Sequence, residues 1–327
     1  MHILITGAAG MIGRKLVERL VHDGSLNGKP IEGLTLADVV APEKPGHFPG
    51  KIDIRTVDLP SPGVAEQLIA AEPDVIFHLA GVVSGEAETN FAKGYRVNLD
   101  GLLFLLEAIR KTGNGYHPKL VFSSSMAVYG APFPESIPDD FHLTPLTSYG
   151  TQKSICELLL ADYTRRGFLD GVGIRLPSIC VRPGKPNKAA SGFFSGIIRE
   201  PLAGQEAILP VSDTILHTHA SPRSAVGFLM HGAALTREQL GPRINLTMPG
   251  VCCTIGEQIA ALRRVAGDKV AARIRHQPDE MIMRIVGGWP HRMDASRARQ
   301  LGFQVENTFD EIIRIHIEED RGGSFVS

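Results

Sequence analysis

Short apolar runs alternate with longer amphipathic stretches through the first half of the chain. Five of these runs have the length and composition of buried strands: residues 2–6, 34–38, 52–57, 75–79 and 120–124. Between them, residues 11–21 and 97–111 carry apolar side chains at helical spacing. Strands that alternate with helices in this way are typical of a mostly parallel sheet with crossover helices. The pattern predicts an α/β protein with a Rossmann-like, doubly wound parallel sheet.

The pattern loosens after about residue 180. Residues 185–196 are rich in Gly, Lys, Asn and Ser and predict a loop able to cover a ligand. A strand is expected over residues 243–248, a helix over 254–266, and further helical segments from Asp294. We therefore expect a sheet-forming domain over residues 1–181, completed by about 214–248. A smaller C-terminal cap would comprise residues 182–213 and 249–327.

A glycine-rich turn joins the first predicted strand to the first predicted helix. Gly7 permits a tight turn, Gly10 lets a diphosphate approach the backbone, and Gly13 lets the helix pack closely on the strand. Met11 and Ile12 lie in the first turn of that helix, where free N–H groups attract anions. This context predicts a dinucleotide-binding turn.

Asp38 ends the second predicted strand, where a carboxylate can bind both hydroxyls of the adenine ribose and repel a 2′-phosphate. Its separation from the glycines exceeds the usual ~20 residues. The insert over residues 23–33, which contains Gly, Asn and Pro, accounts for the excess. NAD is therefore favoured over NADP, with a merely solvated aspartate as the alternative.

The ends of the third and fourth predicted strands carry further candidate cofactor-binding residues, on weaker sequence evidence. Asp58 is placed to reach the adenine amino group, and Leu59 to pack on the ring. Ala80, Gly81 and Val82 follow the fourth strand, where small side chains let the backbone approach the cofactor. Short residues at strand ends are common in any case, so these positions carry less weight.

Two segments carry groups suited to proton transfer. Residues 123–125 are three serines at the end of a predicted strand, and Tyr149 and Lys153 share one face of a predicted helix. A lysine ammonium close to a phenol favours the phenolate. Tyr149 is therefore a candidate base for a substrate hydroxyl, which one of the serines would hold.

The glycine turn, Asp38, the HLA of residues 78–80, the SSSxxVYG of residues 123–130 and the YxxxK pair together resemble the extended short-chain dehydrogenases/reductases. This group is also described as NAD-dependent epimerases/dehydratases. The resemblance covers roughly the first 180 residues. It implies NAD as cofactor, an NAD-binding first domain and a substrate-binding cap.

The same resemblance implies roles for individual residues. The family's catalytic serine stands four residues before the VYG tyrosine, which selects Ser125. The family pattern gives Asn98 a structural or proton-relay role, and it places Pro177 and Ile179 near the nicotinamide. Tyr149 and Lys153 would contact the cofactor as well as perform the chemistry.

Three enzyme classes compete within the family. Family dehydratases carry an Asp-Glu pair after the serine strand, whereas this chain has Met126 and Ala127, which cannot transfer protons. Residues 81–86, 182–200 and 219–225 resemble the branch that oxidises the C2 hydroxyl of the four-carbon sugar acid D-erythronate to a 2-oxo acid with NAD. A nucleotide-sugar 4-epimerase is the alternative. An inactive dinucleotide-sensing protein would be expected to lack part of the Ser/Tyr/Lys set.

A small sugar acid needs a cation for its carboxylate and polar partners for its hydroxyls. Ser125 and Tyr149 would hold the reacting hydroxyl. The further candidates, each more often solvated or structural when taken singly, are Arg182, Lys185, Lys188 and Arg223 as cations and Ser84, Asn187 and Ser191 as hydroxyl partners.

Composition narrows the remaining classes of function. The net charge of -1 over 327 residues gives no general attraction to nucleic acid or anionic membranes. The four cysteines lack metal-ligand spacing, and His217 and His219 share a strand face without an evident third ligand, so no metal is expected. No apolar run approaches ~18 residues, and the N-terminus lacks a signal-peptide pattern. We expect a cytoplasmic enzyme.

Two helix faces suit self-association. The apolar faces of residues 97–109 and 155–163 match the two helices per subunit through which members of this family often dimerise. The same faces would alternatively pack only on the sheet. The sequence therefore leaves two alternatives for these helix faces: a homodimer interface, or packing within one chain only.

Overall fold

The computed structural model describes residues 1–184 and 191–326, which fold into two compact units. Unit 1 contains residues 1–128, 147–175 and 226–246, and unit 2 contains residues 129–146, 176–225 and 247–327. Within the described residues, no helix has the length and apolar character that a membrane crossing requires. How cofactor and substrate binding divide along the chain stays a prediction.

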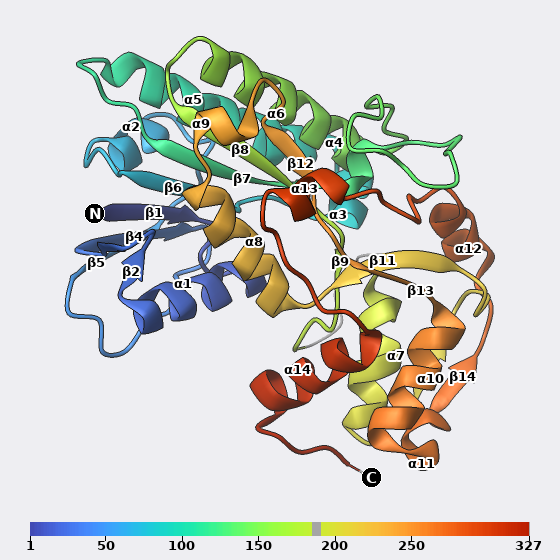
Figure 1. The fold of residues 1–327 in the computed structure, drawn as a ribbon. Helices are drawn as coiled ribbons and strands as arrows, with labels where there is room; N and C mark the ends of the chain where they lie inside the picture. The colour runs from blue at the N-terminus through green and yellow to red at the C-terminus, as the bar shows by residue number, and fades with distance from the viewer. Residues whose placement is uncertain (185–190, 327) are drawn as a thin grey trace. The chain divides into compact units, whose positions relative to one another are not determined.

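Unit 1 is built on a seven-stranded sheet in the order β12-β8-β7-β6-β1-β4-β5 (Figure 1). Its strands are β1 (His2–Thr6), β4 (Gly33–Asp38), β5 (Lys51–Thr56), β6 (Val75–His78), β7 (Lys119–Ser125), β8 (Asp170–Leu176) and β12 (Asn245–Thr247). The pairs β5–β4, β4–β1, β1–β6 and β6–β7 are parallel. The predicted α/β class with a Rossmann-like parallel sheet is confirmed.

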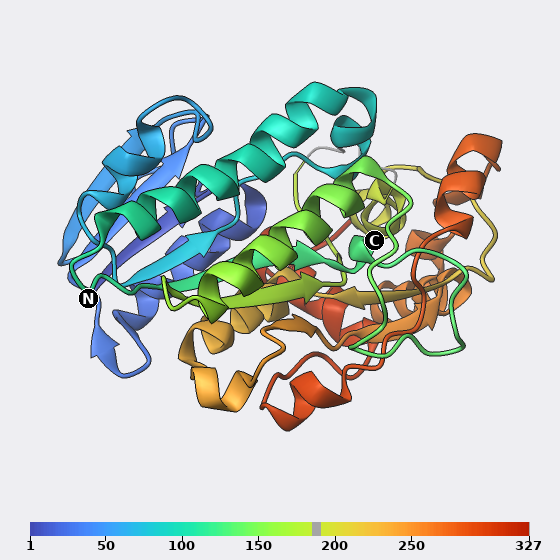
Figure 2. The ribbon, with the colours of Figure 1, turned by 90° about the horizontal axis from the view of Figure 1, so that it is seen from above.

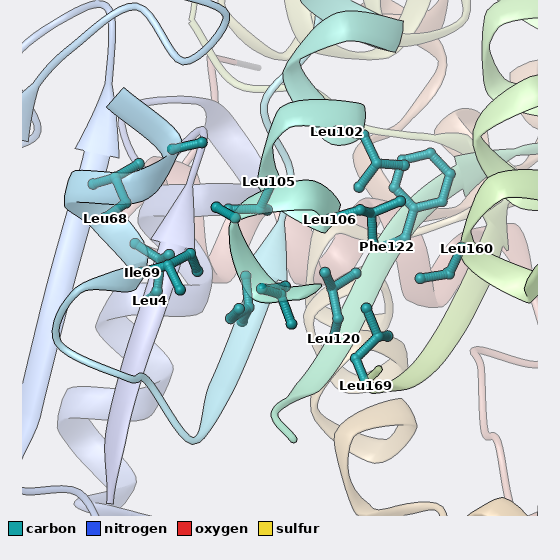
Figure 3. Close-up of a cluster of buried hydrophobic side chains, with 14 of the residues drawn as sticks. Leu4, Leu68, Ile69, Leu102, Leu105, Leu106, Leu120, Phe122, Leu160 and Leu169 are labelled. Carbon is teal, nitrogen blue, oxygen red and sulfur yellow. The ribbon is translucent and has the colours of Figure 1, made fainter. Parts of the chain in front are cut away.

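Helices cover both faces of this sheet, with α2, α5 and α6 on one face and α1 on the other (Figures 1 and 2). The unit contains α1 (Met11–Asp23), α2 (Val64–Ile69), α3 (Ser84–Thr89), α4 (Phe91–Gly94), the π-helix η1 (Tyr95–Asp100), α5 (Gly101–Thr112), the 3-10 helix η2 (Met126–Val128), α6 (Ser148–Arg165), most of α8 (Pro222–Ala234) and α9 (Arg237–Leu240). Figure 3 shows Leu102 and Leu106 of α5 beside Leu120 and Phe122 of β7, all fully buried. Burial of each such side chain stabilises the fold by about 1.5–3 kcal/mol.

The five strands predicted from the sequence are all present, within one residue at each end. The insert after α1 forms a hairpin from β2 (Ser25–Leu26) and β3 (Lys29–Pro30). Asn27 and Gly28 at its turn have positive φ, as tight hairpin turns require. The helix predicted over residues 97–111 is present, and its first turn belongs to the π-helix η1.

Unit 2 combines a three-stranded sheet and a two-stranded sheet with helices around its own core. It contains β9 (Ser178–Ile179), α7 (Gly192–Leu202), β10 (Ala207–Leu209), β11 (Leu216–Ala220), β13 (Val251–Thr254), α10 (Ile255–Ala266), α11 (Asp268–Ala271), β14 (Ile274–His276), α12 (Glu280–Gly287), α13 (Ser296–Gln300) and α14 (Phe309–Arg321). The loop predicted through residue 196 was wrong from Gly192 onward, because Phe194, Ile197 and Ile198 form the buried face of α7. The earlier part of that predicted loop, residues 185–190, lies outside the described residues.

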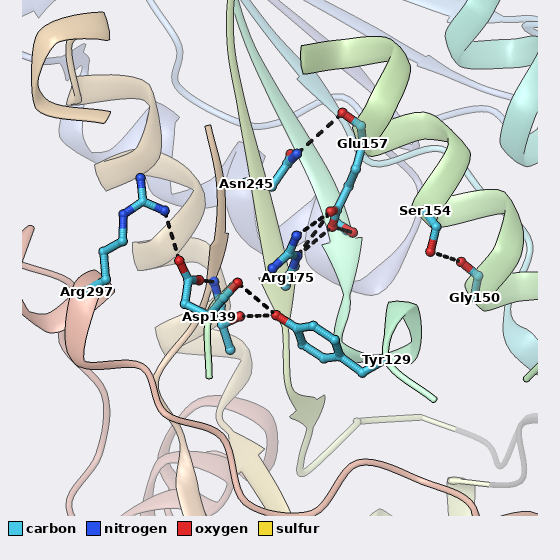
Figure 4. A network of polar contacts seen from close by, with 10 residues as sticks. Tyr129, Asp139, Gly150, Ser154, Glu157, Arg175, Asn245 and Arg297 are labelled. Carbon is cyan, nitrogen blue, oxygen red and sulfur yellow. Dashed lines mark hydrogen bonds and ion pairs between the residues drawn. The ribbon is translucent and has the colours of Figure 1, made fainter. Parts of the chain in front are cut away.

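Residues 129–146 are held within unit 2 by a polar network (Figure 4). The Tyr129 hydroxyl lies 2.8 Å from the Thr247 hydroxyl, and the Thr247 N–H donates to the Asp139 carboxylate at 2.7 Å. Arg297 also donates to Asp139, at 2.9 Å. The VYG tyrosine is therefore a buried anchor of this segment.

A buried ion pair in unit 1 joins α6 to β8 (Figure 4). The Glu157 carboxylate is fully buried and accepts bonds from the Arg175 guanidinium at 2.7, 2.9 and 3.1 Å. It also accepts a bond from the Ser124 hydroxyl at 2.5 Å. Because both charges have good partners, the pair fixes the position of α6 on the sheet.

Replacing Glu157 by alanine should destabilise the protein strongly, because Arg175 would remain charged and buried without its partner. We expect the free energy of unfolding to fall by about 3–5 kcal/mol. Urea unfolding followed by circular dichroism measures this change. The double variant Glu157→Leu/Arg175→Met removes both charges and should recover part of the loss. A single variant as stable as the wild type would contradict the argument.

Candidate active site

The carboxyl ends of four neighbouring strands in unit 1 are aligned. Thr6 lies opposite Ala37 on one side and His78 on the other, and His78 lies opposite Phe122. The residues directly after these aligned positions, such as Gly7 after Thr6 and Ser123 after Phe122, therefore meet at one edge of the sheet. Ligands of open α/β sheets bind at this edge.

The glycine turn has the geometry of a diphosphate cradle. Gly7 has φ +78°, and a Cβ there would lie 2.6 Å from the backbone nitrogen of Ala80. A Cβ on Gly13 would lie 2.2 Å from the carbonyl oxygen of Gly7. Helix α1 begins at Met11 and Ile12, and exposed Gly10 at its N-cap provides no side-chain cap. The uncapped N–H groups and the lack of side chains fit a dinucleotide diphosphate.

Two carboxylates lie at the ends of β4 and β5, where the adenosine half is expected. Asp38 is half-buried and accepts a bond from the Ala9 N–H at 3.0 Å, which ties it to the glycine turn. Asp58 pairs with Arg96 and accepts a bond from Ser61 at 3.1 Å. The Arg96 hydrogen bond lowers the pKa of Asp58, so this carboxylate is charged at neutral pH. Leu59 packs in the buried core of the unit.

The segment after β6 is clamped by Asn98. The Val82 N–H donates to the Asn98 side chain at 2.8 Å, and that side chain donates back to the Val82 carbonyl at 3.2 Å. The Asn98 amide also donates to the buried Gln152 at 2.7 Å. A Cβ on Gly81 would lie 2.9 Å from the Asn98 oxygen, so a larger residue there would push the Asn98 amide out of its position. Asn98 therefore holds Val82 in position, with Gly81 packed against it.

The three serines at the end of β7 have different partners. The Ser123 hydroxyl donates to the His78 carbonyl at 3.1 Å, and the Ser124 hydroxyl donates to Glu157. Ser125 is half-buried, and its oxygen accepts a bond from the Ala127 N–H at 3.2 Å. The hydroxyl hydrogens of Ser123 and Ser124 are thus already donated. The bond to Ser125 uses only its oxygen, so its hydroxyl hydrogen can be donated to a ligand.

Tyr149 and Lys153 lie in the first turns of α6. The Thr147 hydroxyl caps this helix by accepting a bond from the Gly150 N–H at 3.1 Å. The buried Lys153 ammonium donates to the Ser123 carbonyl at 2.7 Å, and it lies 5.7 Å from the centre of the half-buried Tyr149 ring. The tyrosine, the lysine and the serine strand therefore meet as the sequence predicted.

His78 contributes a neutral imidazole beneath this group. It is fully buried, and one ring nitrogen lies 2.8 Å from the Thr6 hydroxyl. Burial, with a smaller effect of Lys153, lowers the pKa of His78 to about 3. The sequence analysis noted His78 only within the HLA motif. The sequence analysis did not identify Glu157 and Arg175, which position α6 on the sheet. One feature of the sequence indicates Glu157: it follows Lys153 by four residues and therefore lies on the same helix face.

The remaining predicted residues are distributed over both units. Ser84 is the first residue of α3 in unit 1, whereas Pro177 and Ile179 are buried residues of unit 2. Arg182 donates to the Ser191 hydroxyl at 3.1 Å, so the structure brings these two together. Arg223 forms ion pairs with two carboxylates of α14, those of Glu318 and Glu319. Lys185, Asn187 and Lys188 lie outside the described residues.

His217 and His219 share one face of β11, as predicted, and both are buried. Among the residues that the structure describes, no cluster of His, Cys, Asp and Glu is arranged to hold a metal ion.

Gly13→Ala should disrupt the cradle, because the added Cβ would collide with the backbone of Gly7. We expect the affinity for NAD to fall by about tenfold or more, equivalent to about 1.4 kcal/mol. Calorimetric titration with NAD measures this affinity. Gly227→Ala is the matched control, because a Cβ on this exposed helical glycine meets nothing within 4 Å. Wild-type affinity in Gly13→Ala would show that the cradle does not form as described.

Known proteins match this chain in sequence and structure. Residues 3–218 match the NAD-dependent epimerase/dehydratase family. A D-erythronate dehydrogenase of Cupriavidus necator is 48% identical over 98% of both chains. A D-erythronate dehydrogenase of Haemophilus influenzae is 40% identical over 98% of this chain and 100% of its own.

The crystal structure of a protein described as a nucleoside-diphosphate-sugar epimerase from Agrobacterium tumefaciens is also similar. It is 64% identical, with a TM-score of 0.97, over 99% of this chain and 95% of that one. The chain therefore belongs to the NAD-dependent epimerase/dehydratase family, which confirms the family and the cofactor predicted from its sequence.

Proposed function

We propose that this protein is an NAD-dependent dehydrogenase that oxidises the C2 hydroxyl of a small sugar acid, D-erythronate, to 2-dehydro-D-erythronate. The observation that carries the proposal is full-length similarity to two D-erythronate dehydrogenases, at 48% and 40% identity. The arrangement of Ser125, Tyr149 and Lys153 supports alcohol oxidation, because it supplies a base, a cation and a hydrogen-bond donor at one edge of the sheet.

The proposed chemistry moves one proton and one hydride. Tyr149 takes the proton of the C2 hydroxyl, the C2–H bond breaks with its electron pair leaving as hydride, and a C2=O double bond forms. NAD, when bound, supplies the acceptor for that hydride. The Lys153 ammonium places a positive charge beside the Tyr149 ring, and Ser125 donates a hydrogen bond to the C2 oxygen. The proton on Tyr149 then passes to solvent.

We propose that the cofactor is held by residues from the ends of these strands and from the segments that follow them. The diphosphate would lie on the N-terminus of α1, the adenine ribose against Asp38, and the adenine near Asp58 and Leu59. Ala80, Gly81 and Val82 would lie beside the middle of the cofactor, with Pro177 and Ile179 near the nicotinamide. Arg182 with Ser191, and also Ser84 and Asn187, remain the proposed substrate contacts. Arg223 is the weakest of the proposed contacts, because two glutamates already neutralise it.

A nucleotide-sugar 4-epimerase is the second candidate, because the similar Agrobacterium tumefaciens protein is described as an epimerase. Both reactions begin with the same hydride transfer, so Ser125, Tyr149 and Lys153 do not separate them. The dehydratase alternative has no support at residues 126 and 127. Met126 is a buried thioether and Ala127 a methyl group, and neither can transfer a proton. The cytoplasmic location and the homodimer through α5 and α6 stay predictions.

The substrate is tested by mixing the purified protein with NAD and a panel of four- to six-carbon sugar acids. NADH absorbance at equilibrium and initial rates identify any acid that is oxidised. We expect D-erythronate to give the highest kcat/KM. UDP-sugars are incubated in parallel and analysed for interconversion. NADH from no acid, together with interconversion of a UDP-sugar, would overturn the dehydrogenase proposal and favour the epimerase.

Tyr149→Phe removes the proposed base and keeps the ring. We expect kcat/KM to fall by about 10²–10⁴-fold, the usual contribution of general base catalysis. Tyr163→Phe is the matched control on the same helix, because its hydroxyl bonds only to Glu107 among the contacts described. That variant should keep nearly full activity. Substantial activity in Tyr149→Phe, with normal NAD binding, would exclude this residue as the base.

A further inference from the structure

The π-helix η1 carries two side chains that reach segments following different strands of the sheet. Asn98 bonds to the backbone of Val82, which follows β6. The Arg96 guanidinium forms an ion pair with Asp58, which follows β5. All of these residues belong to unit 1, and both segments contain residues expected to bind NAD. The Arg96 contact differs from the other in that its partner is a carboxylate, which can bind a ligand itself.

The direction of each hydrogen bond in this group follows from the chemistry of its members. Nη2 of Arg96 donates to Oδ2 of Asp58, because a guanidinium offers only hydrogens and a charged carboxylate only lone pairs. The Ser61 hydroxyl also donates to Oδ2, at 3.1 Å, and accepts a bond from Nη2 of Arg96 at 3.3 Å. The Arg96 hydrogen bond lowers the pKa of Asp58, so this carboxylate is charged at neutral pH. None of the three groups has a tautomer that would reverse these bonds.

The backbone that carries Asp58 and Ser61 forms a closed turn. The Ser61 N–H donates to the Asp58 carbonyl at 2.8 Å, and the residues between them, 59–60, are buried. A Cβ on Gly101, the first residue of α5, would lie 3.5 Å from Leu59, so the turn packs on the helix that follows η1. The carboxylate is therefore held through its backbone by the turn and at Oδ2 by two donors.

The second oxygen of the Asp58 carboxylate, Oδ1, takes part in none of the bonds that the structure describes for this residue. The side chain is 37% exposed, so Oδ1 can meet a ligand that lies on the strand ends. Because two donors hold Oδ2, the carboxylate does not turn freely, and Oδ1 accepts a bond from one direction. An ion pair at this degree of exposure adds little to stability. Its main effect is therefore on the direction of Oδ1.

The segment after β5 runs beside the end of β4, because the Val57 N–H donates to the Asp38 carbonyl at 2.8 Å. Asp38 is proposed to bind the adenine ribose, and the adenine is proposed to lie near Asp58. Adenine presents an amino group, which donates hydrogen bonds. Hypoxanthine presents a carbonyl oxygen at the same position. A carboxylate oxygen fixed there attracts the first group and repels the second.

We propose that Arg96 and Ser61 are positioning residues that give Asp58 its selectivity for the adenine base of NAD. Oδ1 accepts a hydrogen bond from the amino group of the base. Arg96 and Ser61 keep the carboxylate from turning to the neighbouring ring nitrogen, which carries a hydrogen in hypoxanthine. This inference rests on the proposed function in one respect, the placement of the adenine at Asp58. It is independent of which alcohol the enzyme oxidises.

Calorimetric titration with NAD and with nicotinamide hypoxanthine dinucleotide measures this selectivity without turnover. One hydrogen bond to a charged group should make the wild type bind NAD about 10- to 100-fold more tightly than the analogue. Arg96→Met keeps the aliphatic stem but releases Oδ2, and should lower this ratio by about tenfold. Ser61→Ala removes the neutral donor and should lower the ratio less.

Arg55→Met is the matched control. Arg55 forms an ion pair with Asp53 within β5, and its side chain is 51% exposed, against 47% for Arg96. This variant loses an arginine of the same exposure close to the turn, but it leaves the bonds to Asp58 in place. It should keep the wild-type ratio of the two affinities.

Asp58→Asn tests whether Arg96 sets the direction of the side chain. Because Arg96 can only donate, the new amide must turn its oxygen toward the guanidinium and its NH2 group toward the base. An NH2 group there donates to the carbonyl oxygen of hypoxanthine, so the preference should invert in favour of the analogue. In the double variant Asp58→Asn/Arg96→Met the amide can turn either way, and the inversion should disappear. An ion pair that only holds η1 in place predicts no inversion.

The outcomes separate this inference from the proposed function. A wild-type protein that binds NAD selectively but oxidises no sugar acid overturns the proposed function alone. A wild type that oxidises D-erythronate and binds both dinucleotides equally well overturns the inference alone. An unchanged ratio in Arg96→Met, or Asp58→Asn without inversion, would overturn it as well. Thermal melting of each variant shows whether its fold is intact, and Asp58→Asn keeps the test decisive if Arg96→Met does not fold.

Discussion

The position of α6 on β7 is the constraint on which the candidate site depends. Tyr149, Lys153 and Glu157 recur every four residues and therefore lie along one face of this helix. Lys153 bonds to the carbonyl of Ser123, and Glu157 bonds to the hydroxyl of Ser124. Two successive residues of β7 thus hold two successive turns of α6. Ser125, the next residue of the strand, and Tyr149, one turn earlier in the helix, are proposed catalytic residues.

This arrangement explains why adjacent, chemically identical serines are not equivalent. Alternate residues of a strand point to opposite faces, and burial within the sheet gives the first two serines internal partners. Ser123 donates to a backbone carbonyl, and Ser124 donates to a buried carboxylate that Arg175 neutralises. Ser125 stands at the strand end, where its oxygen meets the Ala127 N–H. From the residues alone the three were indistinguishable, and only the family pattern selected Ser125.

Local patterns predicted most of unit 1, because its architecture is encoded over short stretches. The strand, glycine turn and helix over residues 2–23 are set by alternating polarity and by steric demands within a few residues. The π-helix at Tyr95–Asp100 has no such signal, since it differs from an α-helix only in hydrogen-bond register. Helix α7 was missed for another reason. Its buried face, including Phe194, is defined by a core assembled from distant segments of unit 2.

Side-chain pairing across the chain was the least predictable part of the candidate site. Nothing in the sequence near Arg223 indicates that its partners are Glu318 and Glu319, which lie almost a hundred residues away. The pairing of Arg182 with Ser191 was less difficult to anticipate, because the two residues are only nine positions apart in the sequence. A cation that looks available in a sequence can therefore be neutralised in the fold. Spacing identifies groups of suitable chemistry, whereas burial and partners decide which of them remain to bind a ligand.

Hydrogen-bond direction gives Ser125 a role that the two serines before it cannot have. Its oxygen accepts a backbone N–H with a lone pair, and that bond does not use its hydrogen, so Ser125 can donate to a substrate oxygen. Ser123 and Ser124 already donate their hydrogens, to the His78 carbonyl and to the Glu157 carboxylate. In the proposed reaction the C2 oxygen would lose its proton to Tyr149 and would then need a donor. Of these three serines, Ser125 is the one that can be this donor without breaking a bond that holds the strand to its neighbours.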